Sequence, residues 1–173
     1  MTLAGKKVRL RALEPSDVEL LYGWENDTRL WEVSETTAPY SRETLRQFIE
    51  NQQYDIYRTR QQRFVICRLA GNAPVGMIDL FDFDPRNLRA GVGIVICDEA
   101  SRHAGYATEA LELLCSYASK ALNLRGLYAT VGIDNTPSIQ LFRSCGFTEV
   151  GTLRDWSRTE NGWRDEYFFQ KLL

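Results

Sequence analysis

The chain has 173 residues, of which 44% are hydrophobic and 25% are charged, values typical of one soluble globular domain with a buried core. Its formal net charge is −2, which gives no basic surface for a nucleic acid and only slightly favours a cationic partner. No apolar run approaches the roughly 18 residues of a membrane-spanning helix, and charged residues occupy the N-terminal stretch where a signal peptide needs an apolar core. We therefore expect a cytoplasmic protein with no membrane and no nucleic-acid partner.

The cysteine and histidine content argues against a metal or redox site. The cysteines Cys67, Cys97, Cys115 and Cys145 are too far apart in the sequence to form a CxxC pair. Cys67 and Cys97 lie in apolar segments, where a free cysteine packs as a small hydrophobic side chain. His103 is the single histidine, and we expect it to be an exposed loop side chain. The sequence therefore predicts no metal cofactor.

The N-terminal part of the chain is expected to form a strand followed by helices. Residues 6–13 alternate apolar and charged side chains, as a half-buried strand does. A first helix is expected to begin at Pro15 and Ser16. A second is expected over residues 41–58, because its apolar side chains fall roughly on one stripe.

Residues 26–40 separate these two helices and are too irregular in pattern to predict an element. They include Trp31, Glu32 and Glu35. One interpretation is a solvated loop anchored by a single aromatic ring. The other is a wall of the substrate site formed by these three residues, because loops on a rigid scaffold often carry binding groups.

The middle of the chain is rich in strand signals. Residues 63–69, 74–81 and 89–97 are apolar runs joined by short turn-forming stretches. Three consecutive strands with short connections predict an antiparallel meander. Asp79 stands within the second of these apolar runs, and Asp82 follows its end.

The pattern then changes to helices alternating with strands. The expected helices cover residues 106–122 and 138–146, and the expected strands cover residues 126–133, 147–153 and 165–173. A strand, a long helix and a second strand form a βαβ crossover unit with locally parallel pairing. Without a linker or an internal repeat, the whole chain, residues 1–173, is predicted to be a single mixed α/β domain.

The segment "SRHAGYATEAL" begins at Ser101, directly after an apolar strand and at the start of the long helix. Gly105 and Ala107 are small, so a ligand can approach the backbone there. The first N–H groups of a helix lack intrahelical partners and lie at the positive end of its dipole, which suits a pyrophosphate. The alternative is a tight strand-to-helix connection with small residues for packing. Neither a P-loop nor a GxGxxG fingerprint is present.

Two motifs resemble those of the GNAT (Gcn5-related) N-acetyltransferases. Arg102-x-x-Gly105-x-Ala107 matches the family's R/Q-x-x-G-x-G/A motif. The segment "DNTPSIQLFRSCGF" resembles its N-x-x-(A/S)-x-x-x-(Y/F)-x-x-x-G-F motif through Asn135, Ser138, Phe142, Gly146 and Phe147. Nearly the whole chain follows the family's order of elements, and its two ends look most similar to the branch of ribosomal-protein and spermidine N-acetyltransferases.

The resemblance implies a fold and a place for acetyl-CoA. The central sheet is expected to splay, so that the pantetheine arm pairs with backbone groups of Val95, Ile96 and Cys97. The residues expected to wrap the pyrophosphate are Arg102, His103, Ala104, Gly105, Tyr106, Ala107 and Thr108. Asn135, Ser138 and Phe142 would lie beside the pantetheine arm and the thiol.

The implied reaction is attack of a neutral amine on the acetyl thioester in a ternary complex, which needs a proton acceptor and a proton donor. The candidate bases near the expected amine entrance are Glu32, Glu35, Asp79 and Asp82, of which Asp79 is preferred because it stands within an apolar strand. For each of them, the alternative favoured by the sequence is a solvated or ion-paired carboxylate. Ser138 and Cys145 are candidate donors to the departing thiolate, although a cap or packing role is open for both.

Phe142 occupies the position where many members of the family carry a catalytic tyrosine, and phenylalanine has no donor. The sequence therefore predicts an acetyl-CoA-dependent N-acetyltransferase acting on a protein N-terminus, a polyamine or another small amine. A CoA-binding sensor or scaffold without transfer activity is the alternative. The oligomeric state is left open, and a homo-oligomer is compatible with the sequence.

Overall fold

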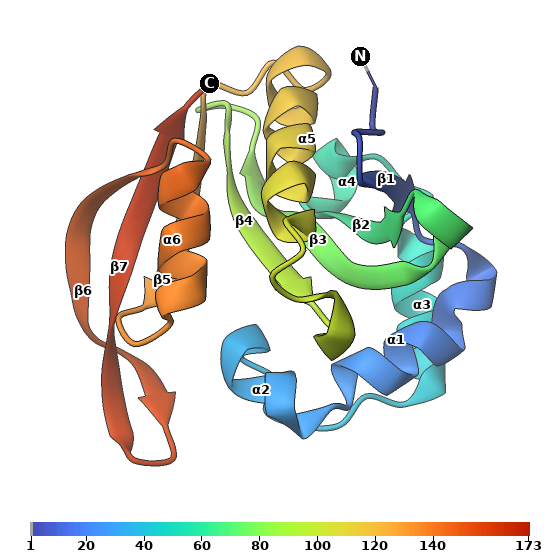
Figure 1. The fold of residues 1–173 in the computed structure, drawn as a ribbon, viewed down its shortest axis with the longest axis horizontal. Coiled ribbons are helices and arrows are strands. Elements are labelled where there is room, and N and C mark those ends of the chain that lie inside the picture. Colours follow the sequence, from blue (N-terminus) through green and yellow to red (C-terminus); the bar gives the residue numbers. More distant parts are fainter. Residues whose placement is uncertain (1) are drawn as a thin grey trace.

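The computed structural model describes residues 2–173 (Figure 1), which form one mixed β-sheet flanked by helices. The strand order in the sheet is β1-β2-β3-β4-β5-β7-β6. The strands are β1 (Val8–Ala12), β2 (Gln62–Arg68), β3 (Pro74–Asp84), β4 (Arg89–Ile96), β5 (Gly126–Gly132), β6 (Thr148–Thr159) and β7 (Gly162–Leu172). The α-helices are α1 (Val18–Glu25), α2 (Thr28–Ser34), α3 (Arg42–Asn51), α4 (Ile56–Thr59), α5 (Tyr106–Lys120) and α6 (Thr136–Ser144). No helix within the described residues is long and apolar enough to span a membrane.

The antiparallel meander predicted for the middle of the chain is confirmed. β2 pairs with β3, and β3 pairs with β4, so that Phe64 lies opposite Ile78 and Ile78 lies opposite Ile94. β3 is fully inside the sheet and reads as an almost continuous apolar run because both of its faces are covered. Asp79 lies in the middle of this apolar run, whereas Asp82 and Asp84 stand near its end, so the surroundings of Asp79 decide what it can do.

The expected splay of the central sheet is also present. Within the described chain, β4 and β5 pair in parallel at three positions, from Arg89 with Gly126 to Gly91 with Tyr128. Beyond Gly91, β4 continues along β3 as far as Ile96, while β5 continues along β7. The two strands therefore diverge towards their carboxyl ends, and in Figure 1 β4 and β5 separate on the side where α2 lies.

The core lies on both faces of the sheet. On one face, α5 buries Ala110, Leu111, Leu114, Cys115 and Ala118, whose spacing places them on one helical side. On the other face, α1 and α3 pack against β2 and β3 in a second apolar cluster. Each fully buried leucine contributes about 1.5–3 kcal/mol through the apolar area removed from water, so the strands that hold the site are firmly fixed.

The N-terminal region differs from the expectation in two places. Residues 26–40 do not lack an element, because α2 forms within them. Asp27 caps α2 by accepting the Arg29 N–H at 3.0 Å, and the buried Leu30 anchors it. The helix expected over residues 41–58 is interrupted between α3 and α4 by a turn, after which Asp55 caps α4 by accepting the Arg58 N–H at 3.1 Å.

Candidate active site

The divergence of β4 and β5 opens into a cavity of about 620 Å³. It reaches from the splayed strands to α2 on one side and to the hairpin of β6 and β7 on the other. Its lining residues are Glu25, Glu32, Val33, Ser34, Glu35, Arg63, Met77, Asp79, Phe81, Asp82, Val92, Gly93, Ile94, Val95, Tyr128, Thr130, Val131, Gly132, Asn135, Ser138, Phe142, Leu153, Trp156, Arg164, Glu166 and Phe168. This volume is in the range of sites that hold a small molecule.

The cavity brings together many of the side chains singled out in the sequence, from four different elements or their ends. These residues are Glu32, Glu35, Asp79, Asp82, Val95, Asn135, Ser138 and Phe142. The remaining candidates lie elsewhere among the described residues: Trp31, Ile96, Cys97, Arg102, His103, Ala104, Gly105, Tyr106, Ala107, Thr108 and Cys145 are outside the lining. The second group consists mainly of the segment at the start of α5, beyond the end of β4.

The segment from Arg102 to Thr108 ends a strand-to-helix connection whose geometry depends on glycine. Gly105 is the residue before α5 and has φ +79°, a conformation that side chains other than glycine rarely adopt. α5 begins at Tyr106, so the N–H groups of its first turn point along the connection. The exposed Arg102 donates from Nε to the Ile96 carbonyl at 3.4 Å, which ties the connection to the end of β4.

Asn135 fixes the start of α6 at the cavity wall. Its side-chain oxygen accepts the Ser138 N–H at 3.2 Å, which makes Asn135 the N-cap of the helix. The half-buried Ser138 therefore faces the cavity from the first turn of α6. The three-residue spacing of Asn135 and Ser138 in the motif is thus the spacing between an N-cap residue and the N–H group that it binds.

Phe142 is fully part of the apolar core beside the cavity, with 4% of its surface exposed. Its ring meets Phe147 edge-on at 5.0 Å between centroids and stacks on Phe169 at 6.0 Å. Cys145 follows on the same helix but is turned to α5, with its Sγ 3.8 Å from the Thr108 carbonyl oxygen. Burial raises the pKa of the Cys145 thiol, so this group stays protonated at neutral pH. Cys145 also lies outside the cavity lining.

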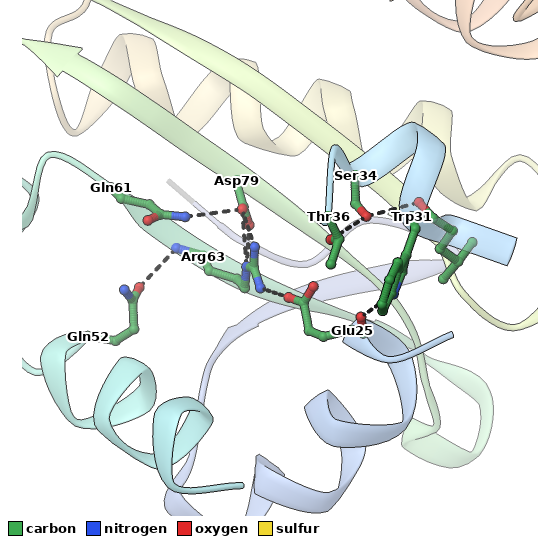
Figure 2. Close-up of polar contacts among 9 residues, drawn as sticks. Glu25, Trp31, Ser34, Thr36, Gln52, Gln61, Arg63 and Asp79 are labelled. Carbon is green, nitrogen blue, oxygen red and sulfur yellow. Dashed lines mark hydrogen bonds and ion pairs between the residues drawn. The ribbon is translucent and has the colours of Figure 1, made fainter. Parts of the chain in front are cut away.

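Arg63 on β2 joins two carboxylates, and all three side chains belong to the cavity lining (Figure 2). Two nitrogens of the guanidinium bind Asp79: Nε lies 2.8 Å from Oδ1, and Nη2 lies 2.7 Å from Oδ2. The third nitrogen, Nη1, pairs with the Glu25 carboxylate of α1. Burial lowers the pKa of the Arg63 guanidinium, but the charges of Asp79 and Glu25 outweigh burial and raise it above its ordinary value. Gln61 also donates to Asp79 Oδ2 at 3.3 Å. Asp79 is therefore held by donors rather than free in the cavity.

Trp31 supports the site without lining it. Its indole N–H donates to the Glu25 carbonyl oxygen at 2.9 Å, as Figure 2 shows, and so fastens α2 to the end of α1. The Ser34 hydroxyl donates back to the Leu30 carbonyl at 2.9 Å and closes the last turn of α2. These contacts hold Glu32 and Glu35 against the open side of the cavity.

Arg164 on β7 is a site residue that the sequence reasoning missed. One terminal nitrogen lies 2.9 Å from Glu32 Oε1 and 3.7 Å from Asp134 Oδ1, and the other lies 3.6 Å from Glu166 Oε1. Glu166 is almost completely buried and also accepts the Ser157 hydroxyl. Arg164 and Glu166 are two residues apart on a strand and so share one face, a signal that was readable in the sequence.

Tyr128 is a second residue that was not anticipated. It lies on β5 where the strands begin to diverge, stacks on Phe168 at 5.5 Å and meets Phe81 edge-on at 6.2 Å. Burial, followed by the negative charge of Asp82, raises the pKa of the Tyr128 hydroxyl. The cavity therefore contains a phenol that stays protonated at neutral pH.

The cavity is strongly acidic. Among the described residues its lining includes six carboxylates and two guanidinium groups. The arginines pair with Glu25, Asp79, Glu32 and Glu166. Glu35 and Asp82 are exposed and take part in no ion pair within the described chain, and both have left-handed backbones, with φ 55° and φ 47°. Such strained residues often gather at functional sites.

A second cavity of about 510 Å³ adjoins the first, because both are lined by Glu32 and Arg164. It extends along the tip of the β6–β7 hairpin, and its other lining residues are Ile133, Asp134, Thr159, Glu160, Asn161, Trp163 and Asp165. Three of these are carboxylates, so the negative field of the first cavity continues into the second. The pair of cavities favours a ligand that carries positive charge.

Comparison with known proteins gives this site a family context. Residues 7–148 match the acetyltransferase (GNAT) domain family. The chain is 28% identical over 173 residues to Uncharacterized N-acetyltransferase p20 of Bacillus licheniformis, with 99% of this chain and 96% of the relative covered.

Solved structures show the same fold. The spermidine N-acetyltransferase of Vibrio cholerae, crystallised in complex with CoA and spermine, has a TM-score of 0.86 and 22% identity, with 95% of each chain covered. The ribosomal-protein-S5-alanine acetyltransferase of Vibrio fischeri has a TM-score of 0.87 and 16% identity, covering 99% of this chain and 96% of its own.

Proposed function

Because the chain belongs to the GNAT acetyltransferase family, we propose that it transfers an acetyl group from acetyl-CoA to a primary amine by direct attack in a ternary complex. The observation that carries this proposal is the cavity between the diverging strands β4 and β5, which reaches from Asn135, Ser138 and Phe142 of the second motif to acidic side chains on α2 and β3. A ternary complex needs no protein nucleophile, so the protein has to hold two reactants together and move protons.

Two features support a fit to acetyl-CoA, which supplies the activated acetyl thioester when bound. The edge of β4 that faces β5 has no strand partner beyond Gly91 within the described residues, so its backbone groups suit the amides of a pantetheine arm. The glycine before α5 leaves the first helical turn open to phosphate. The residues that we assign to the cofactor are Val95, Ile96 and Cys97 for pantetheine, Arg102 to Thr108 for pyrophosphate, and Asn135, Ser138 and Phe142 beside the thiol.

The acidic lining supports an acceptor that carries positive charge besides the reacting amine. Two unit charges 4 Å apart attract by about 4 kcal/mol at an effective dielectric constant of 20, and several carboxylates act together here. We propose that Glu32, Glu35 and Asp82 attract the ammonium groups of the acceptor. A spermidine N-acetyltransferase among the structural neighbours makes a polyamine one candidate, and a protein N-terminus with basic neighbours is another.

The arrangement of charges also supports particular roles in proton transfer. Asp79 is committed to Arg63, so we assign it to holding that guanidinium rather than to proton abstraction. Glu35 and Asp82 take part in no ion pair among the described residues, and we propose that they receive the amine proton, directly or through water. Tyr128 and Ser138 line the cavity, and we propose that a hydroxyl of one of them donates the proton that Phe142 cannot.

The direct test is a turnover assay with acetyl-CoA and a panel of amines. The panel contains linear polyamines, peptides with free N-termini and amino sugars, and mass spectrometry detects an added acetyl group. We expect acetylation of at least one cationic amine and release of free CoA in equal amount. The absence of transfer to every amine, with acetyl-CoA still bound in a calorimetric titration, would contradict the enzyme proposal.

That outcome would favour the second candidate function, a sensor or scaffold that binds acyl-CoA. The observation behind it is the buried phenyl ring of Phe142, packed against Phe147 and Phe169 where many family members carry a hydroxyl. General acid catalysis typically contributes about 10²–10⁴ to a rate. The hydroxyl of Tyr128 in the same cavity is the reason for preferring the enzyme.

A further inference from the structure

The start of β1 and the two residues before it are clamped by hydrogen bonds to the first turn of α5. The carboxylate of Glu109 accepts three backbone N–H groups, from Lys6 at 2.8 Å, Lys7 at 2.7 Å and Val8 at 2.7 Å. Gly5 completes the contact, because a Cβ at that position would lie 2.4 Å from Glu109 Cδ. The clamp joins segments about 100 residues apart in the sequence and fixes the backbone of Lys7 beside the start of α5.

The clamp places the Lys7 ammonium over the connection that precedes α5. Lys7 Nζ donates to the Ala104 carbonyl oxygen at 3.0 Å. It also lies 2.8 Å from the point where a side chain at position 105 would have its Cβ. The missing side chain of Gly105 therefore creates the space that this ammonium occupies, in addition to permitting φ +79°.

The positive charge of Lys7 is available to a ligand. Within residues 2–173 its side chain forms no ion pair, and its ammonium has donors besides the one used by Ala104. The nearby carboxylate of Glu109 is engaged by the three backbone N–H groups: burial alone would raise the pKa of this carboxyl group, but these hydrogen bonds and the positive charge of Lys7 hold it below its ordinary value. Lys7 and the N-terminus of the 15-residue helix α5 therefore present positive charge to the same space.

We infer that Lys7 binds the pyrophosphate of CoA and that Glu109 is the positioning residue that holds Lys7 in place. The inference rests on the proposed cofactor site. It adds to the motif segment a cation from the N-terminal part of the chain, and it accounts for the direction in which the Lys7 side chain extends. A contact between an ammonium group and a phosphate oxygen is charge-assisted and stronger than a neutral hydrogen bond.

The test compares the variants Lys7→Met and Lys7→Arg with Lys6→Met as the matched control. Lys6 is the adjacent exposed lysine, and its side chain forms no hydrogen bond or ion pair among the described residues. Calorimetry of the full chain measures the Kd of CoA and of dephospho-CoA, which keeps the pyrophosphate but lacks the 3′-phosphate. We expect Lys7→Met to weaken both ligands by about tenfold, Lys7→Arg to retain most of the affinity, and Lys6→Met to change the Kd by less than about twofold.

Glu109→Gln tests the positioning role. We expect it to weaken CoA binding to a similar extent as Lys7→Met, and the double variant to be no weaker than Lys7→Met alone, since the two residues act through one contact. Thermal unfolding of each variant identifies any loss of fold. The dependence of CoA binding on salt separates positioning from a purely structural role. If Glu109 positions the Lys7 charge, the slope of log Kd against log salt concentration should become shallower in both Lys7→Met and Glu109→Gln. A purely structural role of Glu109 would leave that slope unchanged.

The outcomes separate the inference from the function on which it rests. If the wild type binds CoA and Lys7→Met binds it equally well, the inference is wrong and the cofactor site stands. If Lys7→Met weakens CoA but not dephospho-CoA, the lysine serves the 3′-phosphate and the pyrophosphate assignment is overturned. If the folded wild type binds neither ligand, the proposed cofactor site and the inference fail together.

Discussion

The guanidinium of Arg164 on β7 lies 2.9 Å from the carboxylate of Glu32 on α2, although 132 residues separate them in the sequence. This ion pair joins the two sides of the proposed acceptor site and stands where its two cavities meet. Arg164 is largely buried, whereas the Glu32 side chain is 60% exposed. A cationic acceptor can therefore compete with Arg164 for Glu32, and removal of Glu32 should act on the acceptor rather than on the cofactor.

The first prediction is that Glu32→Gln combined with Glu35→Gln raises the KM of the preferred cationic amine by about fivefold or more while the KM of acetyl-CoA stays nearly unchanged. The physical reason is the loss of two carboxylates from an acidic cavity. Steady-state kinetics with each substrate varied in turn measures both constants. The control is Glu43→Gln with Glu50→Gln on the exposed side of α3. If the KM values of both substrates stay unchanged in the Glu32→Gln, Glu35→Gln variant, α2 covers the cavity without binding the acceptor.

The second prediction concerns Gly105 and uses Gly71 as a matched control. Both have left-handed backbones, with φ +79° and φ +74°, but a side chain at 71 would meet nothing within 4 Å, whereas one at 105 would meet Lys7 Nζ at 2.8 Å. Gly105→Glu and Gly71→Glu should each lower the free energy of unfolding by about 1 kcal/mol. Only Gly105→Glu should abolish acetyl-CoA binding in calorimetry, since it adds bulk and negative charge at the phosphate segment. Equal affinities would remove Arg102 to Thr108 from the site.

The third prediction is that the Tyr128 hydroxyl supplies the proton that Phe142 cannot. Tyr128→Phe should lower kcat by about tenfold to a hundredfold without changing the Kd of acetyl-CoA. Phe142→Tyr alone should change turnover by at most about tenfold, because a donor is already present. Tyr57→Phe, on the exposed face of α4, serves as the conservative control.

The double variant Tyr128→Phe with Phe142→Tyr sharpens this test. We expect it to recover part of the lost turnover, because the second hydroxyl enters the same cavity from α6. The pH profile should change as well: the alkaline limb that reports the raised pKa of Tyr128 should be lost in Tyr128→Phe. A wild type that transfers to no amine, together with a Phe142→Tyr variant that gains activity by orders of magnitude, would support the sensor instead.

The fourth prediction separates the two remaining donor candidates on α6. Ser138 faces the cavity, whereas Cys145 is buried against the Thr108 carbonyl. Ser138→Ala should lower kcat at unchanged acetyl-CoA affinity, and Cys145→Ala should leave kcat within about twofold while it lowers the melting temperature by removing a buried group. A larger fall in kcat for Cys145→Ala than for Ser138→Ala would reverse this assignment.

The parts of the fold and site that could be predicted from the sequence are those encoded by local spacing. The strand-to-helix connection at Gly105 and the Asn135 motif were found from a few adjacent residues, because helix ends and left-handed turns have strict residue preferences. The role of Asn135 as the N-cap of α6 was not predicted. The meander was readable for the same reason as the connection and the motif, since each of its strands is a largely apolar segment bounded by turn residues.

The parts that could not be predicted depend on contacts between distant segments. α2 was missed because Trp31 and Val33 are weak helix formers, and the helix is stabilised by the burial of Leu30 and by the bond from Trp31 to Glu25. The role of Asp79 depends on Arg63 from the neighbouring strand, which no pattern along the chain could reveal. Glu32 and Arg164 form a pair only through the tertiary arrangement.

The short pairing between β4 and β5 also has a mechanical consequence. Within the described chain, three residue pairs join the half of the sheet formed by β1 to β4 to the half formed by β5, β7 and β6. A ligand that bridges the open strand edges would act as a strut between these halves. Hydrogen exchange of the Val92–Ile96 amides should therefore slow on binding, and saturation at a hundred times Kd should stabilise the whole protein by about 2.7 kcal/mol. The gap between β4 and β5 therefore admits the ligand, and the bound ligand in turn increases the rigidity of the sheet.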